Sequence, residues 1–203
     1  MFYRVSKRLL DILFSLILWV IVSPLVLLIS IFIKLQDGGE IFVGTPVRFG
    51  LNGRSFFMYK FRTMVPNAHT QVNQFNDIHK VINDSRVTKF GKFLRRWDLD
   101  ELPQLINVIL GQMSIVGPRP FYEEEIIQHL KNYPEDEKYF IGIQKVRPGL
   151  TGIWQVSGRN EIPFSQRLKM EYEYVNNRDI IKDIWIMLKT PYVILSGKGK
   201  LNG

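Results

Sequence analysis

Residues 12–33 read ILFSLILWVIVSPLVLLISIFI, and this stretch contains no charged side chain. A straight helix of about 22 residues is ~33 Å long, which is enough to cross the hydrocarbon core of a bilayer. A cleaved signal peptide would have a shorter apolar core followed by small residues, whereas this run continues through Ser23-Pro24 and ends at Lys34. The sequence therefore predicts a membrane helix that is not cleaved.

Two features argue against a plain membrane span. Pro24 removes a backbone hydrogen bond and clashes with the preceding turn, so the helix should kink there, and the Ser23 hydroxyl can bind a carbonyl that the kink frees. A re-entrant hairpin over residues 1–37, which enters and leaves the membrane by the same face, would fit this kink and the basic flanks. A kinked helix that spans the bilayer is the alternative. The basic flanking residues are Arg4, Lys7, Arg8 and Lys34.

A carboxylate, Asp11, stands at the mouth of the apolar run. Lys7 or Arg8, about one turn earlier on the same helix, is its expected partner. We therefore interpret these three residues as the mouth of the membrane element, and Ser23 and Pro24 as its break.

Composition limits the classes of partner and chemistry. A chain of 203 residues can bury one substantial core, so residues 38–203 are predicted to form one domain beside the membrane element. The net charge of +8 indicates anionic partners, which are nucleic acid, phospholipid head groups or phosphorylated metabolites. The absence of cysteine excludes disulfides and thiolate nucleophiles. His69, His79 and His129 lack the spacing of metal ligands and are interpreted as surface residues.

Residues 95–105, RRWDLDELPQL, place three carboxylates behind an arginine pair. One interpretation is a capping box, with Asp98 as N-cap and Glu101 at the third helical position, where acids gain roughly 0.3–1 kcal/mol each from the helix dipole. The other interpretation is that Asp100 and Glu101 carry out chemistry. In either case a helix should follow and end near Gly111.

Three cations, Lys60, Arg62 and Arg119, are candidates for binding phosphate. Residues 40–64 are predicted to form short strands with a hairpin turn at Asn52-Gly53. Lys60 and Arg62 are two residues apart, so their side chains point to the same face of such a strand. They are either phosphate ligands or solvated surface cations. Arg119 lies between two prolines, and a stiff loop suits an arginine that meets an oxyanion. An exposed arginine on a rigid turn is the alternative.

Residues 145–160, KVRPGLTGIWQVSGRN, combine glycines with arginines in one connecting segment. Such loops offer backbone N–H groups and guanidinium groups to a phosphate or a nucleobase. Neither a P-loop nor a dinucleotide fingerprint occurs in the chain.

Two further helices are predicted. Residues 67–85 are polar and indicate a surface helix with loops. A final helix should begin at Asp179 as N-cap and carry apolar residues beside Lys182 and Lys189. This pattern is typical of an interfacial membrane helix, with a core helix whose lysines reach back to water as the alternative.

The segments KRLLDILFSLILWVIVSPL, YKFRTM, LDELPQLINVILGQMSIVGPRP and VRPGLTGIWQVSGRN occur in this order. Together they resemble the small monotopic phosphoglycosyl transferases, the bacterial sugar transferase family, over nearly the whole chain. The resemblance implies a helix-rich, mixed α/β catalytic domain on the cytoplasmic face of the bacterial inner membrane. It also implies a re-entrant helix-break-helix and interfacial amphipathic helices.

The resemblance further implies a magnesium-dependent reaction that moves a sugar 1-phosphate from a UDP-sugar to polyprenyl phosphate and releases UMP. The reaction would initiate synthesis of a glycoconjugate such as capsule, exopolysaccharide, O-antigen or glycoprotein. The family's catalytic pair falls on Asp100 and Glu101, which implies Asp100 as the nucleophile of a covalent phosphosugar intermediate and both residues as Mg²⁺ ligands. The role of capping the following helix would then belong mainly to Asp98.

The remaining site residues form two groups. The candidate phosphate ligands are Lys60, Arg62, Arg95 and Arg119. The candidate nucleotide-sugar ligands are Gly117, Pro118, Arg147, Gly149, Thr151, Gly152, Gln155 and Arg159. Arginine side chains and Mg²⁺ neutralise phosphoryl oxygens as charge develops on them, and a carboxylate can attack phosphorus to form an acyl phosphate.

The expected partners are a UDP-sugar, polyprenyl phosphate and an anionic phospholipid membrane; nucleic acid is not expected, and a homo-oligomer is left open. The rival hypothesis is a membrane-tethered nucleic-acid-binding protein, which rests on the net charge and on the aromatic residues around Lys60 and Arg62. Steeply salt-dependent oligonucleotide binding would favour the rival, and release of UMP from a UDP-sugar would favour the enzyme.

Overall fold

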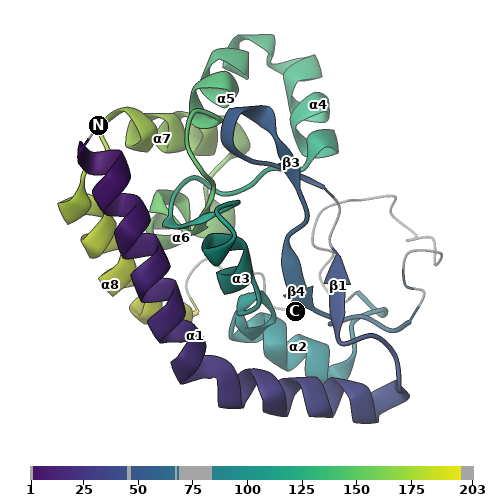
Figure 1. Ribbon diagram of the computed structural model, residues 1–203. Helices are drawn as coiled ribbons and strands as arrows, with labels where there is room; N and C mark the ends of the chain where they lie inside the picture. The colour runs from purple at the N-terminus through teal and green to yellow at the C-terminus, as the bar shows by residue number, and fades with distance from the viewer. Residues whose placement is uncertain (1, 45–46, 67, 69–83, 198–203) are drawn as a thin grey trace.

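The computed structural model of the chain describes residues 2–44, 47–66, 68 and 84–197 (Figure 1). Its α-helices are α1 (Phe2–Asp37), α2 (Lys89–Arg96), α3 (Gln104–Ile109), α4 (Glu123–Asn132), α5 (Glu137–Ile143), α6 (Ile153–Ser157), α7 (Phe164–Asn176) and α8 (Ile180–Ser196). Its 3₁₀ turns are η1 (Leu51–Gly53), η2 (Leu99–Glu101), η3 (Pro134–Asp136) and η4 (Arg159–Glu161). The helix predicted within residues 67–85 lies almost entirely outside the described residues.

The strands are short and form two-stranded sheets, which confirms the helix-rich α/β composition. They are β1 (Phe42–Gly44), β2 (Arg48–Phe49), β3 (Ser55–Phe56), β4 (Tyr59–Phe61), β5 (Ser114–Val116) and β6 (Gly149–Thr151). The pairs β1–β4 and β2–β3 are antiparallel, and β5–β6 is parallel. Asn52 and Gly53 connect β2 to β3 with φ values of 54° and 73°, a left-handed conformation that these two residues adopt readily. The predicted turn is confirmed.

Helix α1 changes direction part-way along its length, as Figure 1 shows. Pro24 has no N–H to donate to the carbonyl of Val20, four residues earlier. The Ser23 hydroxyl donates to that carbonyl at 2.9 Å instead, so the predicted role of Ser23 at the kink is confirmed.

Much of the apolar surface of α1 is uncovered. Val20 is 72% exposed, Ile21 67% and Leu27 62%, and only 17% of the most apolar 18 residues of the helix is buried. By length and composition the helix could cross a membrane.

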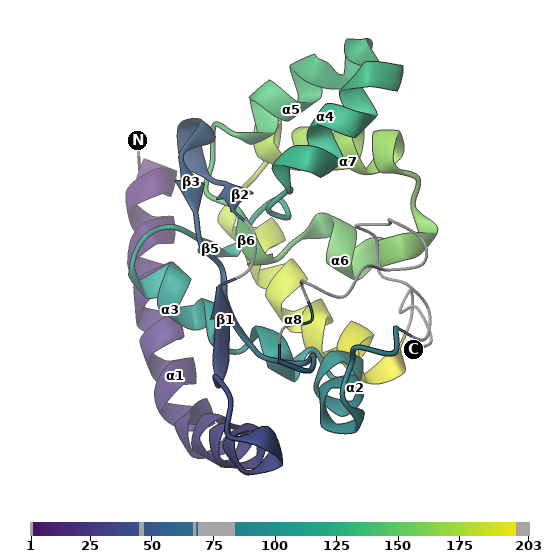
Figure 2. The same cartoon turned by 90° about the vertical axis from the view of Figure 1, so that its right-hand side faces the viewer.

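Three apolar clusters hold the rest of the chain together. The central cluster joins β5, α3, α6 and α8 around Val108, Met113 and Ile186. A second cluster packs the later half of α1 against β4 and α2, and a third joins α4, α5 and α7. In both views, α4, α5 and α7 lie toward the end of the molecule where α1 begins, and α2 lies toward the end where α1 finishes (Figures 1 and 2).

Helix α8 begins as predicted, because the Asp179 carboxylate accepts a hydrogen bond from the Lys182 backbone N–H at 2.8 Å. Ile186 is fully buried in the central cluster. The opposite side of the helix is apolar and uncovered, with Ile181 81% and Leu188 75% exposed. This two-sided pattern favours the interfacial interpretation of α8.

Candidate active site

The acidic pair lies on η2, directly before α3. Asp100 is buried, whereas Glu101 is partly exposed. The Nζ of Lys60, on β4, lies 2.5 Å from Oε1 of Glu101 and 3.9 Å from Oδ2 of Asp100. The alternative in which Lys60 is a solvated surface cation is therefore wrong. The structure brings together two carboxylates and a cation from positions 40 or more residues apart.

Asn107 fixes the strand that presents Lys60. This fully buried amide on α3 accepts a hydrogen bond from the Tyr59 N–H at 3.0 Å and donates to the Phe57 carbonyl at 2.7 Å. Both contacts are to the strand segment immediately before Lys60. Sequence reasoning missed Asn107, although a polar residue among the apolar positions of a short helix was a usable signal.

The acidic pair is also anchored to α1. Leu99 and Leu102 flank it, and both pack against the cluster that contains Val26 and Ile29 of α1. The candidate site thus lies beside the later half of the membrane-length helix.

The capping box predicted at the acidic stretch is wrong. Asp98 has a left-handed φ of 54° and its side chain caps no helix; α3 begins only at Gln104. Instead, Asp98 accepts a hydrogen bond from Arg159 at 2.9 Å, and Arg159 also has a positive φ, of 51°. The ion pair brings the end of the 145–160 segment to the acidic stretch. Gly111, with φ +81°, follows α3 as predicted.

Two other candidate phosphate ligands have partners within the protein. Arg62 is 9% exposed, forms an ion pair with Asp37 at the end of α1, and donates to the Glu40 carbonyl at 2.6 Å. The solvated alternative is therefore wrong for Arg62 as well. The Nε of Arg95 donates to the Thr63 hydroxyl at 2.9 Å.

Arg119 stacks on an indole ring, since its guanidinium carbon lies 4.9 Å from the centre of the Trp154 ring. Its backbone N–H donates to Glu171 at 3.2 Å. Glu171 is fully buried, and burial raises the pKa of its carboxyl to about 7. Burial lowers the pKa of the neighbouring Arg167 guanidinium to about 9. Gln155, next to Trp154, has a buried side-chain oxygen for which the described residues provide no hydrogen-bond donor.

The glycines among the candidate nucleotide-sugar ligands pack backbone against backbone. A Cβ at Gly149 would lie 2.2 Å from the Gly117 nitrogen, and a Cβ at Gly152 would lie 2.1 Å from the Gly117 oxygen. The Pro118 carbonyl accepts a hydrogen bond from the Gly149 N–H at 2.8 Å. The Thr151 hydroxyl, in turn, is 2.7 Å from that of Thr190. These contacts join β5 to β6 and to α8.

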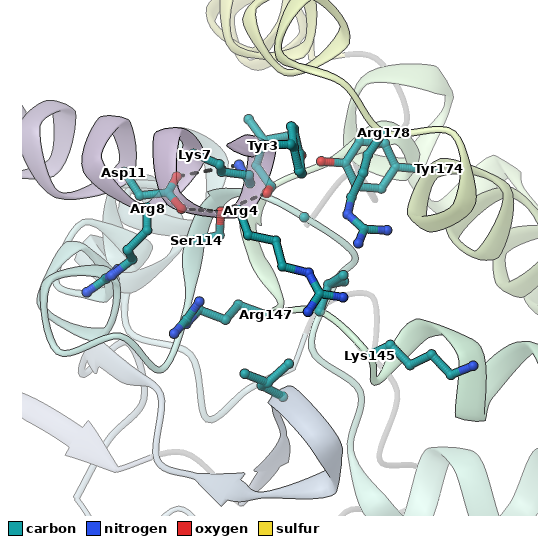
Figure 3. A pocket seen from close by; sticks show the side chains of 14 residues that line it. Tyr3, Arg4, Lys7, Arg8, Asp11, Ser114, Lys145, Arg147, Tyr174 and Arg178 are labelled. Atoms are coloured by element: carbon teal, nitrogen blue, oxygen red, sulfur yellow. Dashed lines mark hydrogen bonds and ion pairs between the residues drawn. The ribbon is translucent and has the colours of Figure 1, made fainter. Parts of the chain in front are cut away.

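Arg147 lies at the other end of α3 from the acidic pair. Its Nε donates to the Gly111 carbonyl at 2.7 Å. It also lines a cavity of about 250 Å³ under the first turns of α1, shown in Figure 3. The structure therefore does not bring Arg147 to Asp100 and Glu101.

The residues predicted at the mouth of α1 lie around the same cavity. Lys7 is 3.5 Å from Asp11, which confirms one of the two expected partners. The other candidate, Arg8, donates instead to the carbonyls of Val108 and Ile109, at 2.7 and 3.0 Å. Asp11 also accepts hydrogen bonds from the hydroxyl of Ser114 and the N–H of Ile115.

The histidine interpretation needs one correction. The His129 side chain is 9% exposed, and its Nε2 lies 2.8 Å from Oδ2 of Asp136, so His129 is not a surface residue. His69 and His79 lie outside the described residues.

Within the described ranges, no group of three or more metal-binding side chains occurs. The two carboxylates of η2 are nevertheless a suitable pair for Mg²⁺, which usually takes one or two protein carboxylates and fills its remaining positions with substrate oxygens and water.

The structure thus places two carboxylates, contacted by one lysine, beside a helix that is long and apolar enough to cross a membrane. Residues 2–197 match the family described as bacterial sugar transferase. The exopolysaccharide production protein ExoY of Sinorhizobium fredii is 41% identical over 204 residues, covering 95% of this chain and 87% of that protein. This chain belongs to the bacterial sugar transferase family.

Two similar proteins are much longer than this chain. The undecaprenyl-phosphate galactose phosphotransferase of Salmonella typhimurium is 39% identical over 97% of this chain but only 42% of its own length. The UDP-glucose:undecaprenyl-phosphate glucose-1-phosphate transferase of Xanthomonas campestris is 37% identical over 97% of this chain and 40% of its own length. The chain therefore corresponds to less than half of each of these two relatives.

Proposed function

We propose that this protein transfers a sugar 1-phosphate from a UDP-sugar to polyprenyl phosphate and releases UMP, as an early step in the synthesis of a surface polysaccharide or another glycoconjugate. The names of the relatives support the substrate classes. The observation that carries the proposal is the contact of Lys60 with both Glu101 and Asp100 beside α1. That arrangement places an acidic pair where a lipid substrate and a water-soluble substrate can meet.

In the proposed reaction, a carboxylate oxygen of Asp100 attacks the phosphorus attached to the sugar. A bond from that oxygen to phosphorus forms while the bond from phosphorus to UMP breaks. An oxygen of polyprenyl phosphate then attacks the same phosphorus, which restores the Asp100 carboxylate and yields a polyprenyl diphosphate sugar. Lys60 lies where it can interact with the phosphoryl oxygens, and Glu101 can accept a proton from the incoming phosphate.

Charge explains why Mg²⁺ is part of the proposal. Two carboxylates and one ammonium group give Asp100, Glu101 and Lys60 a formal net charge of −1. A diphosphate would be repelled by such a site unless further positive charge accompanied it. Asp100 and Glu101 would hold Mg²⁺, which supplies charge neutralisation for the diphosphate oxygens.

Arginines near the acidic stretch are the other proposed source of positive charge. Arg95 lies in the last turn of α2, just before the acidic stretch, and Arg159 reaches that stretch through Asp98. We assign both to the phosphate groups of the donor. Arg119 is held more rigidly, through its backbone bond to Glu171 and its stacking on Trp154, and suits a fixed oxyanion position.

The proposed placement is monotopic, with α1 re-entering the cytoplasmic leaflet. Both ends of α1 are bonded to the same domain, through the Tyr3 hydroxyl to Asp183 of α8 at one end and through Asp37 to Arg62 at the other. A helix that spanned the bilayer would separate its two ends by about 30 Å of hydrocarbon. The uncovered apolar faces of α1 and α8 support burial in lipid.

A rapid-quench measurement of UMP tests the reaction. If Asp100 is the nucleophile, UMP should appear before polyprenyl phosphate is added, in an amount equal to the active enzyme. A sugar-phosphate adduct should then be found on the peptide that contains Asp100. No UMP without the lipid, from enzyme that is active once the lipid is restored, would exclude the covalent route. No UMP from any UDP-sugar of a panel under any condition would overturn the proposed function.

A further inference from the structure

The cavity under the first turns of α1 is separate from the acidic pair. Its volume is about 250 Å³, and it is lined by α1, by β5 and by the segment before β6. Arg8 and Arg147 contact the C-terminal end of α3, through the Ile109 and Gly111 carbonyls, whereas Asp100 precedes the N-terminal end of that helix. The cavity therefore lies at the opposite end of α3 from the candidate active site.

The charge of the cavity is strongly unbalanced. Its lining includes one carboxylate, Asp11, which Lys7 and Ser114 contact. The same lining includes six cations, which are Arg4, Lys7, Arg8, Lys145, Arg147 and Arg178. Arg8 and Arg147 repel each other, and Figure 3 shows their side chains extending toward the same side of the cavity. An anion bound among these groups would offset that repulsion.

Two of the cations are available to a ligand. Among the residues that the structure describes, the side chains of Arg4 and Lys145 make no hydrogen bond or ion pair. Arg4 extends from α1 into the cavity in Figure 3. Arg147 uses its Nε for the Gly111 carbonyl, and its planar guanidinium has further donors that match the geometry of a phosphate.

The position of the cavity identifies the source of the phosphate. The helix turns that supply Arg4 and Arg8 also carry Val5 and Leu9, which are 53% and 64% exposed. The uncharged run begins one residue after Asp11. The cavity thus lies where the polar part of the protein gives way to the proposed membrane element, which is the depth of lipid head groups.

We propose that this cavity binds the phosphate group of an anionic membrane phospholipid, and so fixes the depth at which α1 enters the membrane. The proposal rests on the membrane placement proposed above and not on the transfer reaction. The lipid phosphate would be held by Arg4 and Arg147, and by Lys145 once its side chain, which extends away from Arg147 in Figure 3, rotates toward the cavity. The acyl chains would lie along the exposed apolar side of α1.

The test measures binding of dioctanoylphosphatidylglycerol to the detergent-solubilised full chain, by thermal shift and by native mass spectrometry. We expect saturable binding that weakens by about tenfold or more in the double variant Arg4→Gln, Lys145→Gln, because two charge-assisted contacts are lost. The control double variant Lys131→Gln, Lys138→Gln removes the same charge from exposed positions on α4 and α5 and should bind as the wild type does.

Two outcomes would overturn the proposal. Equal binding of the lipid by the wild type and the Arg4, Lys145 variant would show that the cavity is not the site. Displacement of the lipid by inorganic phosphate or UDP at equal concentration would assign the cavity to a soluble phosphate compound. The Asp100→Asn variant should bind the lipid normally, since the measurement needs no turnover. Failure of the wild type to bind vesicles of any composition would instead contradict the membrane placement.

Discussion

At the scale of single residues, three neighbouring carboxylates have three different environments. Asp98 turns the chain through a left-handed conformation and pairs with Arg159. Asp100 is buried at 8% exposure, and Glu101 contacts Lys60 at 2.5 Å. The same short stretch therefore contains a structural carboxylate and two candidate catalytic ones, and substitutions can separate them.

We expect Asp100→Asn to lower UMP release by about 10³-fold or more, because an amide is not a useful nucleophile toward phosphorus. Asp98→Asn is the matched control. It weakens the ion pair with Arg159 and should cost about 1 kcal/mol of stability or less, and it should lower turnover far less than Asp100→Asn does, because the proposed nucleophile stays in place. Circular dichroism checks that both variants are folded. Substantial UMP release by a folded Asp100→Asn variant would remove Asp100 as the nucleophile.

Glu171 gives a prediction about pH. Burial raises the pKa of its carboxyl from 4.5 to about 7, so the folded protein keeps a proton that the unfolded chain releases in this range. The free energy of unfolding should therefore fall as the pH rises from 4.5 to 7, by up to about 3 kcal/mol from this residue.

Glu171→Gln should flatten that part of the stability profile, because the amide does not titrate. Glu173→Gln, at an exposed position on the same helix α7, is the control and should keep the wild-type slope. Denaturant unfolding of the solubilised chain at about pH 5 and about pH 8 makes the comparison. Identical slopes for the wild type and Glu171→Gln would contradict the prediction.

At the scale of elements, the bend of α1 decides where its later half lies. Pro24 and the bond from Ser23 to the Val20 carbonyl define the bend locally. Beyond it, Val26 and Ile29 pack in the cluster that includes Leu99 and Leu102, on either side of the acidic pair. The geometry of one helix thus reaches the candidate active site through apolar contacts.

Pro24→Ala should straighten α1, because alanine restores the missing backbone hydrogen bond. Spin labels at Leu13 and Leu35, both exposed, would then approach the ~33 Å of a straight helix of that length, from a shorter distance in the wild type. Labels at Val5 and Val20, before the bend, should keep about 22 Å in both proteins. UMP release should fall in the straightened variant. Unchanged distances between Leu13 and Leu35 would refute the role of Pro24.

At the scale of the whole molecule, the two ends of α1 are bonded to one domain although 30 or so residues of helix separate them. The exposed faces of α1 and α8 are both apolar, and the Tyr3 hydroxyl and Lys7 join the two helices through Asp183. Two apolar surfaces linked in this way can enter the same leaflet, with the remaining domain on its surface.

The chain contains no cysteine, so introduced cysteines report topology without background. Cysteines placed singly at Val5 and at Gln36 should both react with a membrane-impermeant reagent only from the cytoplasmic side. A cysteine at Lys131, on α4, marks the side of the domain itself. Labelling of Val5→Cys or Gln36→Cys from the outside would show that α1 spans the bilayer and would overturn the re-entrant placement.

Sequence by itself determined what depends on neighbours along the chain. The uncharged run predicts a membrane-length helix, Pro24 and Ser23 predict its kink, Asn52-Gly53 predicts a turn, and Asp179 predicts a helix start. Each of these was confirmed, because backbone conformation and capping are set by residues within about four positions of each other. The acidic pair was identified because the sequence segments resemble those of a family. The contacts that this pair makes in the fold were not predicted.

Only the tertiary structure decided which distant groups meet. Lys60, on strand β4, contacts Glu101 on η2, and Arg62 pairs with Asp37 at the end of α1. Arg147 and Arg159 belong to one segment of the sequence, but only Arg159 contacts the acidic stretch. The capping box failed for the same reason, since Asp98 is drawn into a contact 61 positions away. Such contacts depend on how the helices and strands pack, and periodicity along the chain does not specify that packing.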